Sequence, residues 1–493
     1  MHKKIRFLLF ILPTFLFAQW TQVEQDIDGE NNDDLSGYSI SMSSDGSIVA
    51  IGAPGNDDGD NNAGHVRIYQ NSGTNWQQIG QDINGEFWFG LSGFSVSLSS
   101  DGSIVAIGEP IFSGEGRVRV YQNNSGTWQQ LGQDIMGEGS DDESGVSVSM
   151  SSNGSIVAIG APLNNGNGSN SGHVRVYENN AGTWQQIGID LDGDDAGDNA
   201  GISVSLSADG SIMAMGAPYG ASNNRGEVKV YQNVGGSWQQ VGQDIEGTND
   251  DSEFGISVSL SNDGNTLAVG SSYDIDISTF SSASVRVYQN VGGTWQQIGT
   301  DITNPVSVIE YARFPVSLSG DASTLAIGAP LDDILYSGDR ENSYAQIYKN
   351  ESGIWQQVDQ NINEATLEDA FGSSISLSDD GATVAVGANY HDNSKGHVRV
   401  FFNSNILNTQ ENIQNNSAAI FPNPSKGKAT IRLHKQFQKI QVQVYDMLGK
   451  EVISTTYTDT SIITLHISQQ PKGMYFVKTT ADEMSFTHKL IKQ

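Results

Sequence analysis

The chain repeats one pattern of alternating and continuous hydrophobic positions. In Gly37–Pro54, Ser39, Ser41 and Ser43 alternate with apolar residues, which is the period-two pattern of a β-strand. An Asp-Gly turn follows, and then Ile48–Gly52, an unbroken apolar run typical of a strand buried on both faces. Further copies of this hairpin begin at Gly93, Gly145, Gly201, Gly255, Arg313 and Gly372. Seven copies of one hairpin indicate a repeat architecture.

Each complete repeat contains two further predicted strands. Gly64–Tyr69 alternates, and after a turn at Ser72-Gly73 the segment Asn75–Ile83 forms a fourth strand. A tryptophan marks this fourth strand in every copy: Trp20, Trp76, Trp128, Trp184, Trp238, Trp295 and Trp355. Four short strands in each period predict one blade of a β-propeller.

The two ends of the repeat region predict a closed ring. The region begins with a lone fourth strand, Trp20–Ile27, and ends after a third strand, Gly396–Phe402. Pairing these two segments completes the seventh blade and removes the open sheet edges that a linear array would expose. We therefore predict an all-β fold, a seven-bladed β-propeller closed by the N-terminal strand, with a small C-terminal β-sandwich. The chain has no Cys, so neither disulfides nor thiol chemistry contribute.

The repeated turns, serines and tryptophans are interpreted as structural. The alternative for Asp45 is a metal ligand, but the short connection leaves no room for a coordination cage. The first-strand serines are small residues where blades converge, and as nucleophiles they lack a His or Asp in fixed relation to them. The tryptophans are expected to pack blade on blade, with carbohydrate stacking as the alternative.

Three third strands begin with a histidine, which suggests a repeated ligand: His65, His173 and His397. Arg117, Glu227, Ser284 and Ala345 take that place in the other blades. Because the histidine is not general, we favour a half-exposed strand position over a ligand.

The variable loops follow the second and fourth strands, so they are expected to share one face of the ring, where binding usually lies. This region is acidic: residues 19–419 contain 52 acidic and 12 basic side chains. Such a field repels nucleic acid and anionic membranes. Clustered carboxylates suit Ca²⁺, and the nearest spacing to a calcium site is Asp192, Asp194, Asp195 and Asp198. Since the loops share no ligand pattern, we predict no cofactor and attribute the acidity to solubility, with calcium as the alternative.

One loop carries aromatic residues outside the tryptophan period. Phe87, Trp88 and Phe89 are adjacent in the loop Glu86–Gly90. They are the candidate ligand-binding residues of the ring, and a hydrophobic plug over the channel is the alternative.

The N-terminus has the pattern of a secretory signal peptide, residues 1–18. Basic residues near the start precede the apolar run Phe7–Phe17, and Ala18 offers a small residue for cleavage. Eleven apolar residues are too few to span a bilayer, and no transmembrane segment is predicted. The propeller is assigned to residues 19–403, and the Asn- and Gln-rich stretch 404–418 to a linker.

Two family resemblances follow from motifs. Phe254-Gly255, Phe371-Gly372 and the recurrent Gly-Ala-Pro resemble the FG-GAP repeats of integrin-α-type propellers, which implies a role in adhesion. Calcium-binding members of that family carry a longer acidic loop between the first two strands than the Ser-Asp-Gly-Ser found here, so their calcium sites are not carried over.

Residues 419–493 resemble the C-terminal sorting domain of the type IX secretion system of Bacteroidota. The motif residues are Pro422, Asn423, Pro424, Gly427, Tyr445, Asp446, Gly449, Gly473 and Tyr475. The resemblance implies a β-sandwich, the type IX secretion machinery as a partner, and a secreted or cell-surface protein exported across the outer membrane. An ordinary accessory sandwich is the alternative.

Together these features predict an exported binding or adhesion-type scaffold for an unidentified extracellular protein or glycan. We predict that it is not an enzyme, because no acid–base pair or nucleophile constellation recurs. The alternatives are an extracellular polysaccharide lyase or hydrolase, and a passive surface-coat protein.

Overall fold

The computed structural model describes residues 20–272, 284–303, 314–330, 343–363, 369–403, 418–421, 427–446, 450–481 and 484–492. The predicted signal peptide lies outside these residues, as does the predicted linker apart from Ala418. The chain divides into two compact units, Met1–Asn408 and Thr409–Gln493, which are described separately.

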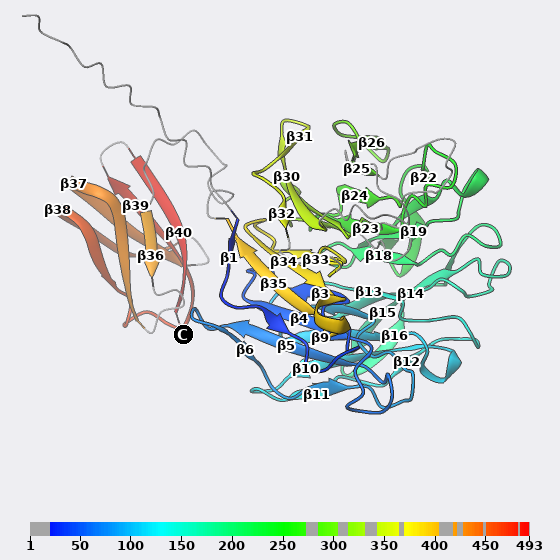
Figure 1. Cartoon of the computed structure of the whole chain (residues 1–493). Coiled ribbons are helices and arrows are strands. Elements are labelled where there is room, and N and C mark those ends of the chain that lie inside the picture. The colour runs from blue at the N-terminus through cyan, green and yellow to red at the C-terminus, as the bar shows by residue number, and fades with distance from the viewer. Residues whose placement is uncertain are drawn as a thin grey trace, which may run out of the picture. The chain divides into compact units, whose positions relative to one another are not determined.

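In the first unit the described residues form seven antiparallel sheets arranged around a common centre, as the sequence predicts (Figure 1). The innermost strands are β3 (Ser39–Met42), β8 (Ser95–Leu98), β13 (Ser147–Met150), β18 (Ser203–Leu206), β23 (Ser257–Leu260), β28 (Val316–Leu318) and β33 (Ser374–Leu377). The second strands are β4 (Ile48–Ala53), β9 (Ile104–Glu109), β14 (Ile156–Ala161), β19 (Ile212–Ala217), β24 (Thr266–Gly270), β29 (Thr324–Ala329) and β34 (Thr383–Ala388). The third strands are β5 (His65–Asn71), β10 (Arg117–Asn123), β15 (His173–Asn180), β20 (Glu227–Val234), β25 (Ser284–Asn290), β30 (Tyr344–Glu351) and β35 (His397–Phe402).

The prediction of one continuous fourth strand is wrong. This strand consists of two short pieces that both pair with the third strand. The first pieces are β6 (Trp76–Gln78), β11 (Trp128–Gln130), β16 (Thr183–Gln186), β21 (Ser237–Gln240), β26 (Trp295–Gln297), β31 (Ile354–Gln357) and β1 (Thr21–Gln22). The second pieces are β7 (Ile83–Asn84), β12 (Ile135–Met136), β17 (Leu191–Asp192), β22 (Ile245–Glu246), β27 (Ile302–Thr303), β32 (Ile362–Asn363) and β2 (Ile27–Asp28). The strand breaks because Gly80 and its equivalents adopt a positive φ, +78° at Gly80.

The N-terminal segment completes the seventh blade, which confirms the predicted closure. Thr21 and Gln22 of β1 pair with Phe402 and Phe401, and Ile27 of β2 pairs with Val398. One hydrophobic cluster joins this blade to blade 1, since Ile27 and Val398 pack with Val49 and Trp76. Hydrogen bonds and apolar packing therefore both close the ring.

The innermost strands are joined by a closed circle of serine hydrogen bonds. The Ser41 hydroxyl accepts a hydrogen bond from the Leu98 amide of the next blade at 2.9 Å. The same contact recurs between every pair of neighbouring blades, at 2.9–3.0 Å, with acceptors Ser97, Ser149, Ser205, Ser259, Ser317 and Ser376. The serines thus connect blades, and each bond contributes about 0.5–1.5 kcal/mol.

The hairpin turns form a second circle. The Ser44 amide donates to the Ser100 carbonyl of the next blade, and this backbone bond continues around all seven turns at 2.8–2.9 Å. Within each turn the Asp organises the chain: Asp45 Oδ1 accepts from the Ser43 and Ser47 hydroxyls and from the Ser47 amide. Within this turn only Gly46 has a positive φ, of +70°. The contribution of Asp45 is to accept hydrogen bonds, which favours its interpretation as a turn residue over a metal ligand.

The glycine of the repeated Gly-Ala-Pro motif marks the closest approach between blades. A Cβ at Gly52 would lie 2.0 Å from the carbonyl oxygen of Gly93 in the next blade. Equivalent contacts of 1.9–2.4 Å occur at Gly108, Gly160, Gly216, Gly270, Gly328 and Gly387. The position excludes any side chain, because the neighbouring backbone cannot move away without breaking its own sheet.

The tryptophans pack between blades, as predicted. Their Nε1 atoms donate to a carbonyl of the preceding blade at 2.8–3.1 Å in five cases, Trp76, Trp128, Trp184, Trp238 and Trp295. Trp128 and Trp184 are only 3 % exposed. A side chain buried in this way cannot stack on carbohydrate, so that alternative is excluded for these residues.

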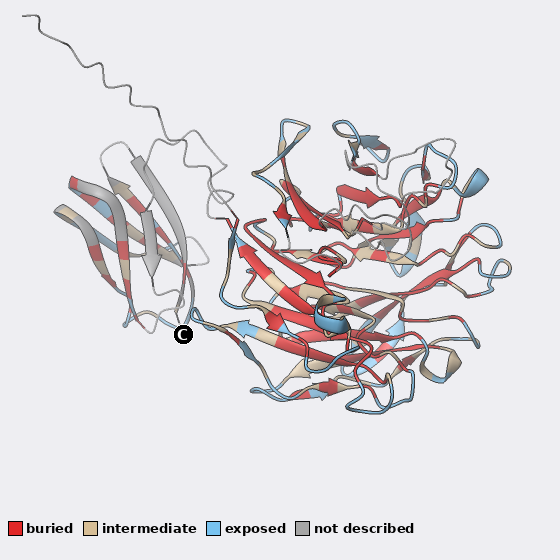
Figure 2. Cartoon of the chain, in the orientation of Figure 1, coloured by how far each residue is buried: buried red, intermediate tan, exposed pale blue. Residues whose placement is uncertain are grey.

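Buried residues concentrate in the strands of the first unit, while the connections are exposed (Figure 2). Each apolar cluster draws on two adjacent sheets; one contains Ala50, Val66 and Ile68 from blade 1 with Val105 and Ile107 from blade 2. The ring is therefore stabilised by seven interfaces between blades. Within the described connections there are three short helices: η1 (Phe112–Gly114), η2 (Ser222–Asn224) and α1 (His391–Ser394).

The second unit contains β36 (Ala418–Phe421), β37 (Lys428–Asp446), β38 (Glu451–His466), β39 (Gly473–Ala481) and β40 (Met484–Lys492). The predicted sandwich is built from one sheet rather than two, because long β37 pairs with β36, β38 and β39. Register shifts between Arg432 and Phe437 bend this strand, and β36 contacts β40. The core includes Ile431, Ile440 and Leu490.

Candidate ligand-binding face

The two variable loops of each repeat meet on one face, as predicted. In blade 1 the Phe89 amide donates to the Asn61 carbonyl at 2.9 Å, and Leu91 donates to Asn62 at 3.2 Å. These bonds join the loop after β7 to the loop after β4. In other blades Asp141 donates to Gly114 and Asp251 to Asn223 in the same way. The tight turns lie at the other ends of the strands, so the length variation is confined to the loop face.

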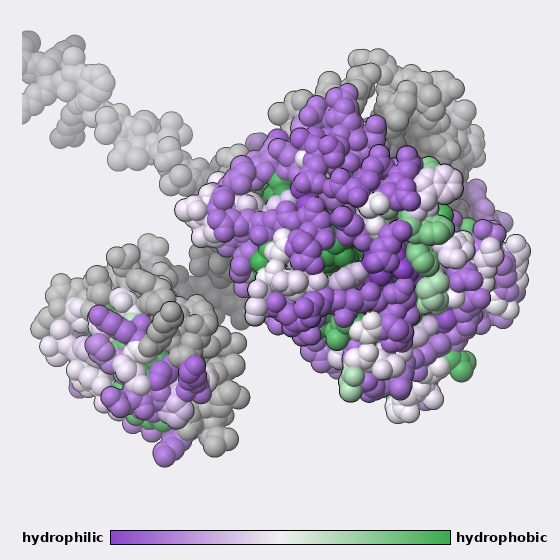
Figure 3. All heavy atoms as spheres, turned by 90° about the horizontal axis from the view of Figure 1, so that it is seen from below, coloured by the Kyte–Doolittle hydropathy of each residue, from purple (hydrophilic) through white to green (hydrophobic). Residues whose placement is uncertain are grey.

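Phe87, Trp88 and Phe89 form an exposed aromatic patch on this face. Their exposed fractions are 42 %, 58 % and 40 %. The Trp88 and Phe89 rings are 4.7 Å apart in an edge arrangement, and Phe87 lies 5.1 Å from Phe112. Phe89 has a φ of +56°, which is uncommon for a bulky residue and points to a fixed loop conformation. The side of the propeller that is visible in Figure 3 is mostly hydrophilic, with hydrophobic residues in smaller groups.

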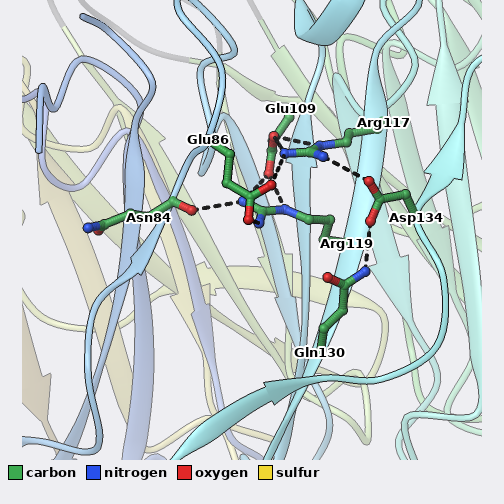
Figure 4. A network of polar contacts seen from close by, with 7 residues as sticks. All are labelled: Asn84, Glu86, Glu109, Arg117, Arg119, Gln130 and Asp134. Atoms are coloured by element: carbon green, nitrogen blue, oxygen red, sulfur yellow. Dashed lines mark hydrogen bonds and ion pairs between the residues drawn. The ribbon is translucent and has the colours of Figure 1, made fainter. Parts of the chain in front are cut away.

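Glu109 is the centre of a buried ionic network, which Figure 4 shows. Glu109 is fully buried, and its two carboxylate oxygens accept from Arg117 Nε at 2.8 Å and from Arg119 Nε at 2.6 Å. Arg117 also binds Asp134 at 2.8 Å, while Glu86 lies 3.6 Å from both guanidinium groups. Breaking such a buried network by removing one partner typically costs about 3–5 kcal/mol.

The network and the aromatic patch are connected through Phe112. The Arg117 guanidinium carbon lies 3.6 Å from the centre of the Phe112 ring, and Phe112 in turn contacts Phe87. A desolvated cation–aromatic contact of this kind is worth up to about 2 kcal/mol. The Phe87 ring is therefore held by Phe112 and Arg117, and fixing a side chain before binding lowers the entropic cost of binding a ligand.

Reasoning from the sequence missed Glu109, although the sequence carries a signal for it. Glu109 replaces the alanine of the repeated Gly-Ala-Pro motif, and Arg117 replaces the histidine that begins the third strand of blade 1. The two positions pair in the sheet, Arg117 with Glu109 and His65 with Ala53. Opposite charges introduced together at paired positions could have been recognised by comparing the repeats.

The prediction for the three histidines is wrong in one respect. His65, His173 and His397 are at most 1 % exposed rather than half-exposed. Strand pairing also places Tyr344, not Ala345, at this position in blade 6, since Tyr344 pairs with Asn363 as His65 pairs with Asn84. In blade 1, Glu30 from the preceding blade lies next to His65, and such a neighbour is not revealed by alternation along a single strand.

The four aspartates proposed as the nearest calcium spacing do not converge on one point within the described residues. Asp194 is 2.5 Å from Lys229 Nζ, and Asp192 lies 3.8 Å from His173 Nδ1. Asp198 is buried, and its carboxylate accepts the Asp195 amide at 2.8 Å, whereas Asp195 is exposed. Asp34 and Asp142 make the same local contact with Asn31 and Gly139. Part of the loop acidity therefore serves to fold the loops.

The motif of the second unit is described in part. Gly427 accepts a hydrogen bond from the Ile467 amide, and the buried Tyr475 donates to the Pro471 carbonyl at 2.7 Å. Tyr445 and Asp446 end β37, and Gly473 begins β39 with a φ of +150°. Pro422, Asn423, Pro424 and Gly449 lie outside the described residues. The described motif residues thus stand at strand ends and turns.

Comparison with known proteins identifies this unit. Residues 419–493 match the family described as the secretion system C-terminal sorting domain. A search of curated proteins finds no match. Among solved structures, the crystal structure described as a "putative 6-phosphogluconolactonase" from Bacteroides uniformis aligns with 12 % identity and a TM-score of 0.48, covering 67 % of this chain and 86 % of that chain.

The fold and the sorting domain together define the class of protein. It is an exported protein with a seven-bladed β-propeller, and the sorting domain directs it through the type IX system to secretion or to the outer-membrane surface. Among the described residues, no helix has the length and apolar sequence needed to cross a membrane.

Proposed function

We propose that the propeller is a non-catalytic binding module, which presents its loop face to an extracellular glycan. The observation that carries the proposal is the exposed aromatic patch of Phe87, Trp88 and Phe89, in which the Phe87 ring packs on Phe112 and Phe112 on Arg117. Exposed aromatic rings on a rigid scaffold stack on the apolar faces of sugar rings, while nearby acidic and amide groups accept and donate hydrogen bonds to hydroxyls.

Two further features support an adhesion-type role. The hairpins resemble FG-GAP repeats, whose propellers act in adhesion, and export places the ring where such ligands occur. The excess of carboxylates disfavours anionic polymers, so a neutral or basic glycan fits the face better than a sulfated one.

The test is a glycan array probed with the purified mature chain and with the variant Phe87→Ala/Trp88→Ala/Phe89→Ala. We expect the wild-type protein to bind a defined group of glycans and the triple variant to lose at least about tenfold in affinity, since each stacked ring contributes about 1 kcal/mol or more. The matched control is Tyr219→Ala, an aromatic residue on the loop side of blade 4 with 40 % exposure.

Unchanged binding by the triple variant would exclude the aromatic patch as the site. Binding only to proteins on a parallel protein array would replace the glycan with a protein ligand. Circular dichroism of both variants verifies that the ring remains folded.

A further inference from the structure

Four potential metal ligands converge at the interface between blades 7 and 1. They are Glu30 after β2, Asp58 in the loop after β4, His65 at the start of β5, and Asp82 just before β7. One ligand atom from each lies within 4.8 Å of every other. Two distant segments of the chain therefore bring an imidazole and three carboxylates to one point.

The imidazole of His65 lies at the base of this cluster. It is 1 % exposed, and its Nδ1 atom has no hydrogen-bond partner among the described residues. A ring nitrogen that carries no proton offers a lone pair for coordination. An unpaired buried polar group is costly, so a bound ligand would compensate a real penalty.

The charges of this cluster are not balanced by the protein. Arg67 lies 3.3 Å from Glu30 and is the one cation paired with the cluster in the described part of the chain. Three carboxylates and one guanidinium leave an excess of two negative charges.

The equivalent position in blade 2 contains a second cation. There Arg117 replaces the histidine and binds Asp134 at 2.8 Å. In blade 4, Glu227 takes the place of the histidine, and Lys229, at the position of Arg67, lies 2.5 Å from Asp194 and 3.2 Å from Glu227. Blade 1 keeps the histidine, and its fourth member, Asp58, is absent from the three-membered group of blade 3, Glu138, His173 and Asp190.

We infer that Glu30, Asp58, His65 and Asp82 form a binding site for one divalent transition-metal ion, Zn²⁺ in the first instance. One imidazole nitrogen and carboxylate oxygens are ligands that Zn²⁺ accepts, whereas Ca²⁺ prefers oxygen ligands alone. A divalent cation would neutralise the excess charge. Entry is open because Glu30 and Asp58 are exposed, while His65 fixes the inner ligand. Such an ion would link Glu30, which follows the last strand of blade 7, to the three ligands of blade 1.

The site is tested by titrating the mature full-length chain, freed of metal with a chelator, with Zn²⁺ in competition with a chromophoric chelator. We expect one tight Zn²⁺ per chain and a rise in the melting temperature when it binds. His65→Gln should weaken the tight site by at least about tenfold, because even second-sphere partners of metal ligands are worth about 10–100-fold in affinity. Asp58→Asn, at an exposed position, provides a second variant that is expected to fold and to weaken binding as well.

The matched control is His173→Gln, the same substitution at the same repeat position of blade 3, which should leave the tight site unchanged. Equal Zn²⁺ affinity for wild type and for folded His65→Gln or Asp58→Asn would overturn the assignment. Ca²⁺ binding as tight as that of Zn²⁺ would also overturn it, since it would indicate an oxygen-only site. None of these outcomes depends on glycan binding.

Discussion

At the residue scale, the ring depends on small residues at repeated positions where neighbouring blades meet. Gly52 and its equivalents allow the next backbone to approach, and the first-strand serines form hydrogen bonds across the interface. The turn aspartates accept two or three hydrogen bonds each. One turn departs from the pattern. Six described turns place Gly at a φ of +67° to +71°, whereas blade 6 places Ala322 there at +56°. Ala322 is therefore strained by its own Cβ.

Replacing this residue should stabilise the propeller. Ala322→Gly relieves a left-handed alanine, and we expect a gain of about 1 kcal/mol in unfolding free energy. The measurement is the midpoint of denaturant unfolding. The reverse change, Gly102→Ala, is the control: it imposes the same strain and places a Cβ 2.6 Å from Ile48 Cδ1, so it should destabilise the protein. A lower midpoint for Ala322→Gly would show that the alanine methyl contributes more by packing than it costs in strain.

At the scale of the elements, the N-terminal segment is the one that closes the ring. Trp20 is 7 % exposed and packs in a cluster with Phe371 and Phe401. Asp26 accepts two hydrogen bonds from Arg399, at 2.9 and 3.0 Å. Burial raises the pKa of Asp26, but the hydrogen bonds from Arg399 and Gln22 outweigh it and lower the pKa overall. Without this segment β35 would present an unpaired edge.

Deletion of residues 20–28 should therefore cause loss of the cooperative transition or aggregation, measured by calorimetry and light scattering. A synthetic peptide covering residues 19–30 should restore the transition, because the strand would pair again without a covalent link. The conservative control is Glu24→Ala, an exposed residue in the same segment. A truncated protein that melts at the wild-type temperature would show that the seventh blade does not need its fourth strand.

At the scale of the whole molecule, the propeller is acidic, and its turns add a common dependence on pH. Burial raises the pKa of Asp45, Asp101, Asp209, Asp263 and Asp321, but hydrogen bonds from the adjacent Ser or Asn residues more than offset this and lower each pKa overall. A carboxylate whose pKa is lower in the folded state stabilises the protein above the unfolded pKa, about 3.9. This stability is lost as the pH falls through the folded pKa.

We expect the unfolding free energy to be insensitive to these turns above about pH 5 and to fall steeply below about pH 4. The combined variant Asp45→Asn/Asp101→Asn/Asp209→Asn should show a shallower decline. Blade 3 already contains such a turn, since Asn153 Oδ1 accepts from Ser151 and Ser155 without a charge. Denaturant unfolding between pH 3 and 7, with a chelator present, tests this. An identical decline in the variant would place the acid sensitivity elsewhere.

The repeat made much of the fold predictable. Period-two alternation, the Asp-Gly turn and the recurrent tryptophan identified the blades, and the unpaired terminal segments identified the closure. The sequence analysis missed the break in the fourth strand. A glycine such as Gly80 permits many backbone conformations, and only its contact with the tryptophan of the next blade shows which one it adopts. The burial of His65 was missed for the same reason: it comes from a neighbouring blade.

The candidate sites were predictable only in part. Adjacency in the sequence was enough to identify Phe87, Trp88 and Phe89. The spacing of the acidic loop could not reveal that the Asp198 carboxylate accepts a hydrogen bond within its own loop, or that Asp194 pairs with Lys229 of the next blade.

By itself the sequence determined the number of blades, their strand order, the closure and the export signal, because each of these is written locally and repeated or placed at a chain end. Only the tertiary structure decided which side chains meet: Glu109 between two arginines of the neighbouring strand, and His65 among Glu30, Asp58 and Asp82. The physical reason is that these partners lie 7 to 35 positions from Glu109 or His65 in the sequence, on other strands and loops. Only the pairing of strands and the packing of one sheet against the next set their distances.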